Sequence, residues 1–150
     1  EMKAKKKKIT LALDELAKET VLVHADRERI QQVLTNLVVN SIKYGHSNGT
    51  TEVSVESLGD YRVVVRVTDN GEGIEQQHIS RLFERFYRVD KSGARSEGGS
   101  GLGLSIVKHI TDAHQENLFV DSKYGIGSEF SFTLPKETSQ NYSFAYFCAK

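Results

Sequence analysis

The stretch DRERIQQVLTNLVVNSIKY, residues 26–44, decides the fold class because it carries the clearest helical periodicity in the chain. Its apolar side chains recur at steps of three and four residues, as Ile30, Val33, Leu34, Leu37 and Val38. Asp26 precedes the first turn and is a residue type that caps helix N-termini. The sequence therefore predicts one long amphipathic helix whose apolar stripe packs against a second layer.

A polar stripe runs beside the apolar one on this helix. Asn36, Asn40 and Lys43 are spaced i, i+4 and i+7, so at ~100° per residue they share a sector of roughly 60°. Asparagine is unfavourable in a helix interior, and two in one stripe indicate a function. An amide oxygen can ligate Mg²⁺, a hard cation that is commonly shared with substrate phosphates.

The rest of the chain alternates between strand-like and helix-like segments. Two further helices are predicted over 76–86 and 102–113. Strand-like composition or alternation marks the segments 9–13, 51–57, 61–68, 118–121 and 128–134. The turn Leu58–Asp60 joins two of these strands as a hairpin. We therefore expect an α/β fold, a two-layer sandwich in which a mixed, mostly antiparallel sheet carries about three helices on one face.

Composition limits the classes of function. The chain has 150 residues, and its 20 basic and 20 acidic side chains cancel, which argues against a nucleic-acid partner. Cys148 is the only cysteine, so neither a disulfide framework nor a zinc site is expected. No apolar run approaches the roughly 20 residues that cross a bilayer. We expect one domain over residues 9–135, a linker over 1–8 and a flexible tail over 136–150.

Glycine is concentrated in three clusters. Glycine allows positive φ and a close backbone approach, which a phosphate or a flat base requires. The clusters comprise Gly71 and Gly73; Gly98, Gly99, Gly101 and Gly103; and Gly125 and Gly127. Their order around the polar helix indicates a nucleotide site.

These features fall into five ordered motifs that resemble those of a known family. The motifs are an N box over 36–44, a first glycine box over 69–74, an F box over 82–88, a second glycine box over 99–104 and a third over 124–130. Together they resemble the catalytic and ATP-binding domain of sensor histidine kinases, within the superfamily that includes gyrase, Hsp90 and MutL. The resemblance covers residues 9–135 and implies the Bergerat ATP-binding fold.

The resemblance implies how the adenine would be recognised. Asp69 would accept a hydrogen bond from the adenine amino group, with Gly73 beside it. Ser128 would assist through a water molecule, and Tyr44 would pack on the base.

The resemblance also implies how the phosphates would be held. Asn40 would hold Mg²⁺, and Lys43 would supply positive charge. The backbone amides of residues 101–104 would meet phosphate oxygens at a helix N-terminus. Arg88 and Arg95 would reach the phosphates from a lid that follows Phe86.

The complete set of expected site residues follows from the motifs. Catalytic roles fall to Asn36 and Lys43, and the metal role to Asn40. ATP would contact Asn36, Asn40, Lys43, Tyr44, Asp69, Gly71, Gly73, Ile74, Phe83, Tyr87, Arg88, Gly99, Ser100, Gly101, Leu102, Gly103, Leu104 and Ser128.

Two alternative functions remain at this point. A gyrase- or Hsp90-type hydrolase activates water with a glutamate four residues before the magnesium asparagine, but this position is Asn36, and an amide cannot take a proton from water. A nucleotide-dependent interaction module would bind ATP without chemistry. One departure from the family is local: Gln115–Asn117 replaces a usual Gly-Gly turn.

The resemblance implies partners outside this chain. The acceptor histidine would lie on a dimerisation hairpin of the same parent protein, with residues 1–8 as the end of that hairpin or its linker. A response regulator receiver domain would take the phosphoryl group next. We expect the fragment to be monomeric, the parent to be a homodimer, and the domain to be the cytoplasmic part of an inner-membrane sensor.

Overall fold

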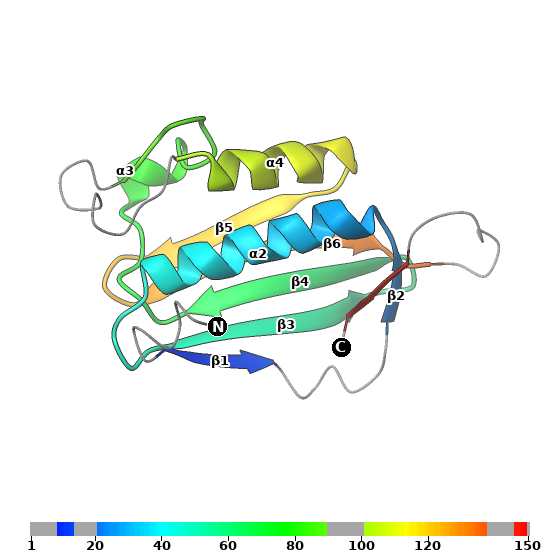
Figure 1. Ribbon diagram of the computed structural model, residues 1–150, viewed down its shortest axis with the longest axis horizontal. Coiled ribbons are helices and arrows are strands. Elements are labelled where there is room, and N and C mark those ends of the chain that lie inside the picture. The colour runs from blue at the N-terminus through cyan, green and yellow to red at the C-terminus, as the bar shows by residue number, and fades with distance from the viewer. Residues whose placement is uncertain (1–8, 14–20, 90–100, 138–145, 150) are drawn as a thin grey trace.

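Two layers make up the molecule. The structure is a computed structural model that describes residues 9–13, 21–89, 101–137 and 146–149. A five-stranded sheet forms one layer, and the helices lie together on one of its faces (Figure 1). The expected two-layer α/β sandwich is confirmed. Among the described residues, no helix has the length and apolarity needed to span a membrane.

The sheet is mixed and mostly antiparallel, with the strand order β1-β3-β4-β6-β5. Only β1 and β3 run parallel, and the other three pairs are antiparallel. The strands are β1 (Thr10–Leu13), β3 (Thr50–Leu58), β4 (Arg62–Asp69), β5 (Leu118–Lys123) and β6 (Gly127–Pro135).

Two helices cover the inner face of the sheet. Helix α2 (Arg27–Lys43) begins after Asp26, whose carboxylate accepts a hydrogen bond from the Arg29 amide at 3.2 Å. Helix α4 (Gly103–Ala113) lies beside it. The predicted apolar stripe of α2 is buried against alternate side chains of β4 and β6. This core includes Ile30, Val33, Leu37, Val63, Val65, Val67, Phe130, Phe132 and Leu134.

The predicted helix over 76–86 is wrong in length. Only α3 (Gln76–Ile79) is helical, and the chain continues in tight turns held by bonds from N–H to the carbonyl three residues earlier, as at Arg81 and Glu84. Leu82 is buried and Phe83 packs edge-to-face on Phe130. These adjacent apolar residues must both reach the core, which favours turns over a regular helix.

A second, two-stranded sheet was not predicted. Strand β2 (Val21–His24) pairs antiparallel with β7 (Tyr146–Ala149). The expected flexible tail is therefore wrong for β7, while residues 138–145 lie outside the described part of the chain. Each strand has four residues, so the pairing depends on tertiary contact that no local pattern reveals.

The turn at residues 115–117, which stands in place of the usual Gly-Gly turn, depends on Gln115. Gln115 takes the left-handed conformation with φ 57°. Glu116 is then buried, accepting a hydrogen bond from the Thr133 hydroxyl at 2.6 Å and lying 3.2 Å from the Arg62 guanidinium. These two partners anchor the turn to the sheet.

His114 joins the end of α4 to the start of α2. Its Nδ1 donates to the Ile110 carbonyl at 2.8 Å, and its Nε2 accepts from the Asp26 amide at 3.1 Å. We expect His114→Ala to lower the free energy of unfolding by about 0.5–1.5 kcal/mol per lost bond. Urea denaturation checks this, with exposed His109→Ala on the same helix as the matched control. Equal midpoints for the two variants would contradict the bridging role.

Candidate functional site

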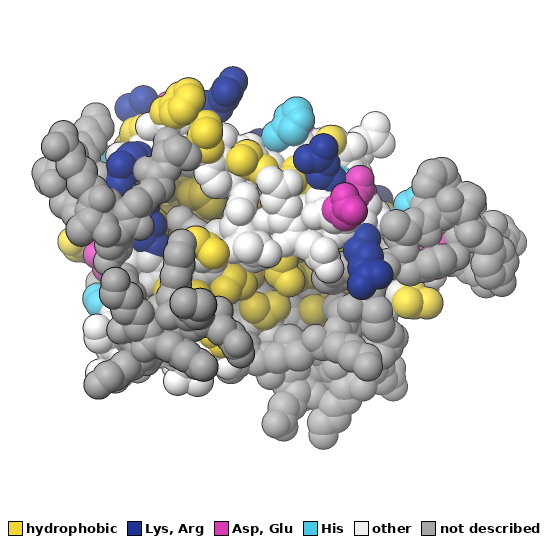
Figure 2. Space-filling model, viewed as in Figure 1, with side chains coloured by type: hydrophobic (Ala, Val, Ile, Leu, Met, Phe, Trp, Pro, Cys, Tyr) yellow, Lys and Arg dark blue, Asp and Glu magenta, His cyan; other side chains and the backbone are white. Residues whose placement is uncertain are grey.

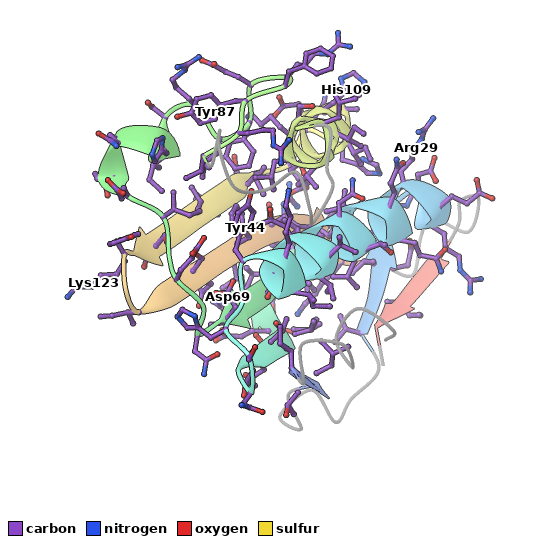
Figure 3. All side chains as sticks on the ribbon, turned by 60° about the vertical axis from the view of Figure 1, so that its left-hand side comes forward. Arg29, Tyr44, Asp69, Tyr87, His109 and Lys123 are labelled. Atoms are coloured by element: carbon purple, nitrogen blue, oxygen red, sulfur yellow. The ribbon has the colours of Figure 1, made fainter. Side chains whose placement is uncertain are left out.

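The candidate site lies where α2 and β4 both end. Tyr44 follows α2, Asp69 ends β4, and Tyr87 comes from the turns after α3; all three lie at the same end of the molecule (Figure 3). Three separate segments therefore meet there. The start of α4 supplies the fourth side of the site.

These segments enclose a cavity of about 210 Å³. Eleven of the predicted site residues line it, namely Asn36, Asn40, Lys43, Tyr44, Gly73, Ile74, Tyr87, Arg88, Gly101, Gly103 and Leu104. Five other predicted residues do not line it, namely Asp69, Gly71, Phe83, Leu102 and Ser128. Gly99, Ser100 and Arg95 are outside the described residues.

The polar stripe of α2 forms one wall, as its helical spacing predicts. Asn36, Asn40 and Lys43 all line the cavity. The Asn36 amide nitrogen also donates to the Gly103 carbonyl at 3.3 Å. This bond connects the middle of α2 to the first turn of α4. It also orients the Asn36 side chain so that its amide nitrogen points toward that turn. The Lys43 ammonium lies 5.2 Å from the centre of the Tyr44 ring.

Arg88 brings a guanidinium group to the lining of the site. Its Nε and Nη2 atoms are buried, and neither has a hydrogen-bond partner among the described residues. Burying a charged donor without a partner is unfavourable. The side chain lines the cavity. This arrangement is suited to an anionic ligand.

The N-terminus of α4 adds to this positive character. Gly101, Gly103 and Leu104 line the cavity, and among the described residues no side chain caps the helix at Leu102. An uncapped N-terminus leaves amide groups free to bind an anion and carries partial positive charge. Together with Arg88, it makes one side of the cavity selective for anions.

Asp69 sits just outside the cavity lining, against the first glycine box. Its Oδ1 accepts a hydrogen bond from the Gly71 amide at 2.9 Å. Burial raises the pKa of the Asp69 carboxyl above its ordinary value, and hydrogen bonds from Gly71, Ser128 and Ser41, with the charge of His46, partly oppose this. The site thus holds a partly dehydrated carboxylate.

The Ser128 hydroxyl has a partner within the protein, Ser122. The Ser122 hydroxyl accepts from the Ile74 amide at 2.8 Å and donates to the Gly127 carbonyl at 3.1 Å. The Ser128 hydroxyl lies 2.7 Å from it and is therefore the donor of that pair. Ser128 thus helps to hold the loop that carries Ile74. Nothing in the sequence pattern indicated Ser122.

Two glycines are needed for close packing of backbone on backbone. Gly73 has φ +74°, and a Cβ there would lie 2.2 Å from the Lys123 carbonyl oxygen. A Cβ on Gly127 would lie 2.1 Å from the Asp69 carbonyl oxygen. The first and third glycine boxes thus pack directly on each other. At these two positions glycine shapes the site through protein packing.

Sequence reasoning missed four residues that line the cavity, namely Val39, Glu72, Leu82 and Val89. Val39 lies three residues after Asn36 and four before Lys43, so its helical position does indicate the site. Glu72 lies inside the first glycine box. Leu82 and Val89 form apolar walls on turns whose geometry no periodicity predicts.

Comparison with known families gives one match over most of the chain. Residues 25–138 match HATPase_c, described as histidine kinase-, DNA gyrase B- and HSP90-like ATPase. Similar proteins include the sensor protein kinase WalK of Staphylococcus saprophyticus, 37% identical over 135 residues, covering 89% of this chain and 22% of that protein. WalK of Staphylococcus haemolyticus is 38% identical over 131 residues, covering 87% of this chain and 22% of that protein. This chain thus spans about a fifth of these relatives.

Solved structures share the fold. A mycobacterial sensor histidine kinase, MprB, has a TM-score of 0.75 at 27% identity, covering 90% of this chain and 89% of that one. Histidine kinase ThkA in complex with the response regulator TrrA has a TM-score of 0.71 at 29% identity, covering 93% of this chain and 38% of that one.

Proposed function

Because this chain belongs to the HATPase_c family of histidine kinase-, DNA gyrase B- and HSP90-like ATPases, we propose that it binds ATP with Mg²⁺ and presents the γ-phosphate to a histidine on another domain of its parent protein. The observation that carries the proposal is Arg88, which lines the cavity and whose buried Nε and Nη2 atoms have no hydrogen-bond partner among the described residues. A phosphate oxygen is the partner that these atoms lack.

The adenine would lie between Asp69 and Tyr44. A Cβ on Gly71 would approach the Tyr44 carbonyl oxygen at 2.5 Å and the Asp69 Oδ1 at 3.0 Å, so the three residues are close neighbours. The carboxylate accepts from the amino group of adenine, and guanine offers a carbonyl oxygen at the corresponding position. The dehydrated acceptor is thus selective for adenine.

The phosphates would extend toward the start of α4. Lys43 on α2 and Arg88 on the F box line the same cavity as Gly101 and Gly103. Two cationic side chains and a helix N-terminus can together neutralise the triphosphate and fix its direction. The transferring group would then lie near Asn36 and the first turn of α4.

Mg²⁺ would be held by Asn40 together with the phosphates. No group of three or more His, Cys, Asp or Glu side chains in the described residues forms a metal cage, which fits a cation that takes most of its ligands from substrate and water. Asn40 supplies an amide oxygen from the cavity wall. When bound, the cation neutralises charge that develops on the transferring phosphate.

A hydrolase is the less suitable alternative. Asn36 has no basicity near neutral pH, and its amide nitrogen is already engaged with the Gly103 carbonyl. The five histidines, all in described parts of the chain, do not line the cavity either. At the position of the water-activating glutamate the chain has Asn36, and no histidine lines the cavity, so the phosphoryl acceptor would come from another domain.

The parent protein is proposed to supply the remaining parts. They are a dimerisation hairpin with the acceptor histidine and a response regulator receiver domain that takes the phosphoryl group next. ThkA, with its response regulator, supports the second partner by similarity. The parent would be a homodimer, this fragment a monomer, and the domain the cytoplasmic part of an inner-membrane sensor.

Asn40→Ala tests the magnesium assignment. The side chain lines the cavity and lies outside the apolar core, so we expect the fold to persist while most of the gain in ATP affinity from Mg²⁺ is lost. Calorimetric titrations with Mg²⁺ and with EDTA measure that gain. Lys43→Ala should have a smaller effect, because its charge acts on the phosphates in both conditions. Wild-type binding of Mg-ATP by both variants would refute these roles.

A further inference from the structure

Four side chains stack along the turns that replace the expected second helix. The amides of Arg81, Glu84 and Tyr87 each donate to the carbonyl three residues earlier, with distances of 3.0, 3.0 and 3.3 Å. This bonding brings side chains at i and i+3 onto one side. His78, Arg81, Glu84 and Tyr87 follow that spacing and form what we call the turn cluster.

Each member of the turn cluster contacts another member. His78 Nδ1 forms a hydrogen bond with the Tyr87 hydroxyl, and their rings lie 5.9 Å apart. The Arg81 guanidinium lies 4.4 Å from the centre of the Tyr87 ring and forms an ion pair with Glu84 at 3.0 Å. Tyr87 is therefore held at its hydroxyl and on its ring face.

The turn cluster is next to the anion-binding side of the cavity. Tyr87 lines the cavity, and so does Arg88, the next residue in the chain. Basic side chains gather at this end of the molecule (Figure 2), where Arg81, Arg85 and Arg88 line a second, more open surface hollow. Arg81 and Arg85 are exposed, but Arg88 is turned inward with unpartnered atoms.

An inward, unpartnered guanidinium needs a backbone that holds it in place. The charge of Arg88 would be better solvated outside the protein. Its peptide is fixed on the N-terminal side by Tyr87, whose hydroxyl is bonded to His78. Preorganising a cation in this way lowers the cost of ordering it when an anion binds.

We propose that His78 is a positioning residue for phosphate binding: through its hydrogen bond to Tyr87 it keeps the next residue, Arg88, in the lining of the cavity. The inference rests on the proposed function, since it assumes that the phosphates of ATP occupy the anion-binding side. His78 itself does not line the cavity. It acts only through Tyr87 and Arg88.

The test compares ATP with adenosine, which lacks phosphates. His78→Ala should weaken Mg-ATP binding about two- to tenfold, the range for one hydrogen bond, and leave adenosine affinity unchanged. Tyr87→Phe, which removes the hydroxyl that His78 contacts, should weaken Mg-ATP binding by a similar factor. His78→Gln should restore part of the loss, because a side-chain amide can also bond to the hydroxyl. Exposed Gln76→Ala on the same short helix is the matched control, and thermal melting confirms that each variant is folded.

A double-mutant cycle separates positioning from a general effect on the fold. In an Arg88→Ala background, His78→Ala should cause no further loss of Mg-ATP affinity. Additive losses, equal losses for adenosine, or unchanged ATP affinity in His78→Ala would each overturn the inference while leaving the proposed function in place. If the wild-type protein does not bind ATP at all, the proposed function is refuted, and so is the inference that rests on it.

Discussion

Mixed with Mg-ATP, this chain alone is expected neither to label itself nor to release phosphate above the uncatalysed background. Asn36 stands where a water-activating carboxylate is needed, and its amide is bonded to the Gly103 carbonyl. Phosphoryl transfer depends mainly on holding donor and acceptor in line. No histidine of the chain lines the cavity, so no internal acceptor is in position.

Adding a separate helical hairpin from the same parent protein should restore slow transfer in trans. The expected gain is on the order of 10³-fold or more in labelling rate, because positioning alone supplies several orders of magnitude. The product is acid-labile, base-stable label on the hairpin after incubation with γ-labelled ATP. A hairpin whose acceptor histidine is replaced by alanine is the control. Rapid phosphate release without the hairpin would favour the hydrolase. Label on one of the chain's own histidines would refute the claim that the acceptor lies on another domain; these histidines are His24, His46, His78, His109 and His114.

The Asp69→Asn substitution is expected to move affinity and stability in opposite directions. Replacing a charge-assisted acceptor by an amide should cost about 1.5–3 kcal/mol, at least about tenfold in ADP affinity. Asparagine keeps an oxygen that can accept from the Gly71 amide, as Asp69 does at 2.9 Å. The turn should therefore persist.

The stability effect follows from the raised pKa of the Asp69 carboxyl. The folded protein binds this proton more tightly than the unfolded chain, for which the ordinary pKa is 3.8. The favourable contribution to stability is thus fully present below pH 3.8 and lost as the pH rises through the folded-state pKa. At pH 7 the buried, ionised carboxylate destabilises the folded state. The Asp69→Asn variant should therefore have a melting temperature equal to or higher than that of the wild type.

Nucleotide binding has the opposite pH dependence at this residue. The adenine amino group needs the ionised acceptor, so ADP affinity should be full above the raised pKa of Asp69 and fall as the pH drops through it. The Asp69→Asn variant should not show this fall in ADP affinity at low pH, whereas the variant Asp121→Asn, at an exposed position, should still show it. Unchanged ADP affinity in Asp69→Asn would remove this residue from the site.

The long helix and the sheet were predictable because their patterns are local. The stripe of Ile30, Val33 and Leu37 repeats over several turns and is buried as expected. Alternation along β4 and β6 likewise placed Val65 and Phe132 in the core. The same helical period brought Asn36, Asn40 and Lys43 onto one wall.

The parts that were not predictable depend on contacts between distant segments. The helix over 76–86 gave way to turns because Leu82 and Phe83 both pack inward. The pairing of Val21–His24 with Tyr146–Ala149 joins two segments that are far apart in the sequence. The hydroxyl network of Ser122 and Ser128 exists only because β5 and β6 are neighbours. No spacing within one segment encodes these contacts.

The most direct measurement of the central claim is a calorimetric titration of this chain with Mg-ATP and Mg-GTP under identical conditions. The account predicts saturable one-to-one binding of ATP and at least about tenfold weaker binding of GTP, because guanine cannot donate to the Asp69 carboxylate at the adenine position. Absence of ATP binding, or equal affinity for the two nucleotides, would contradict it.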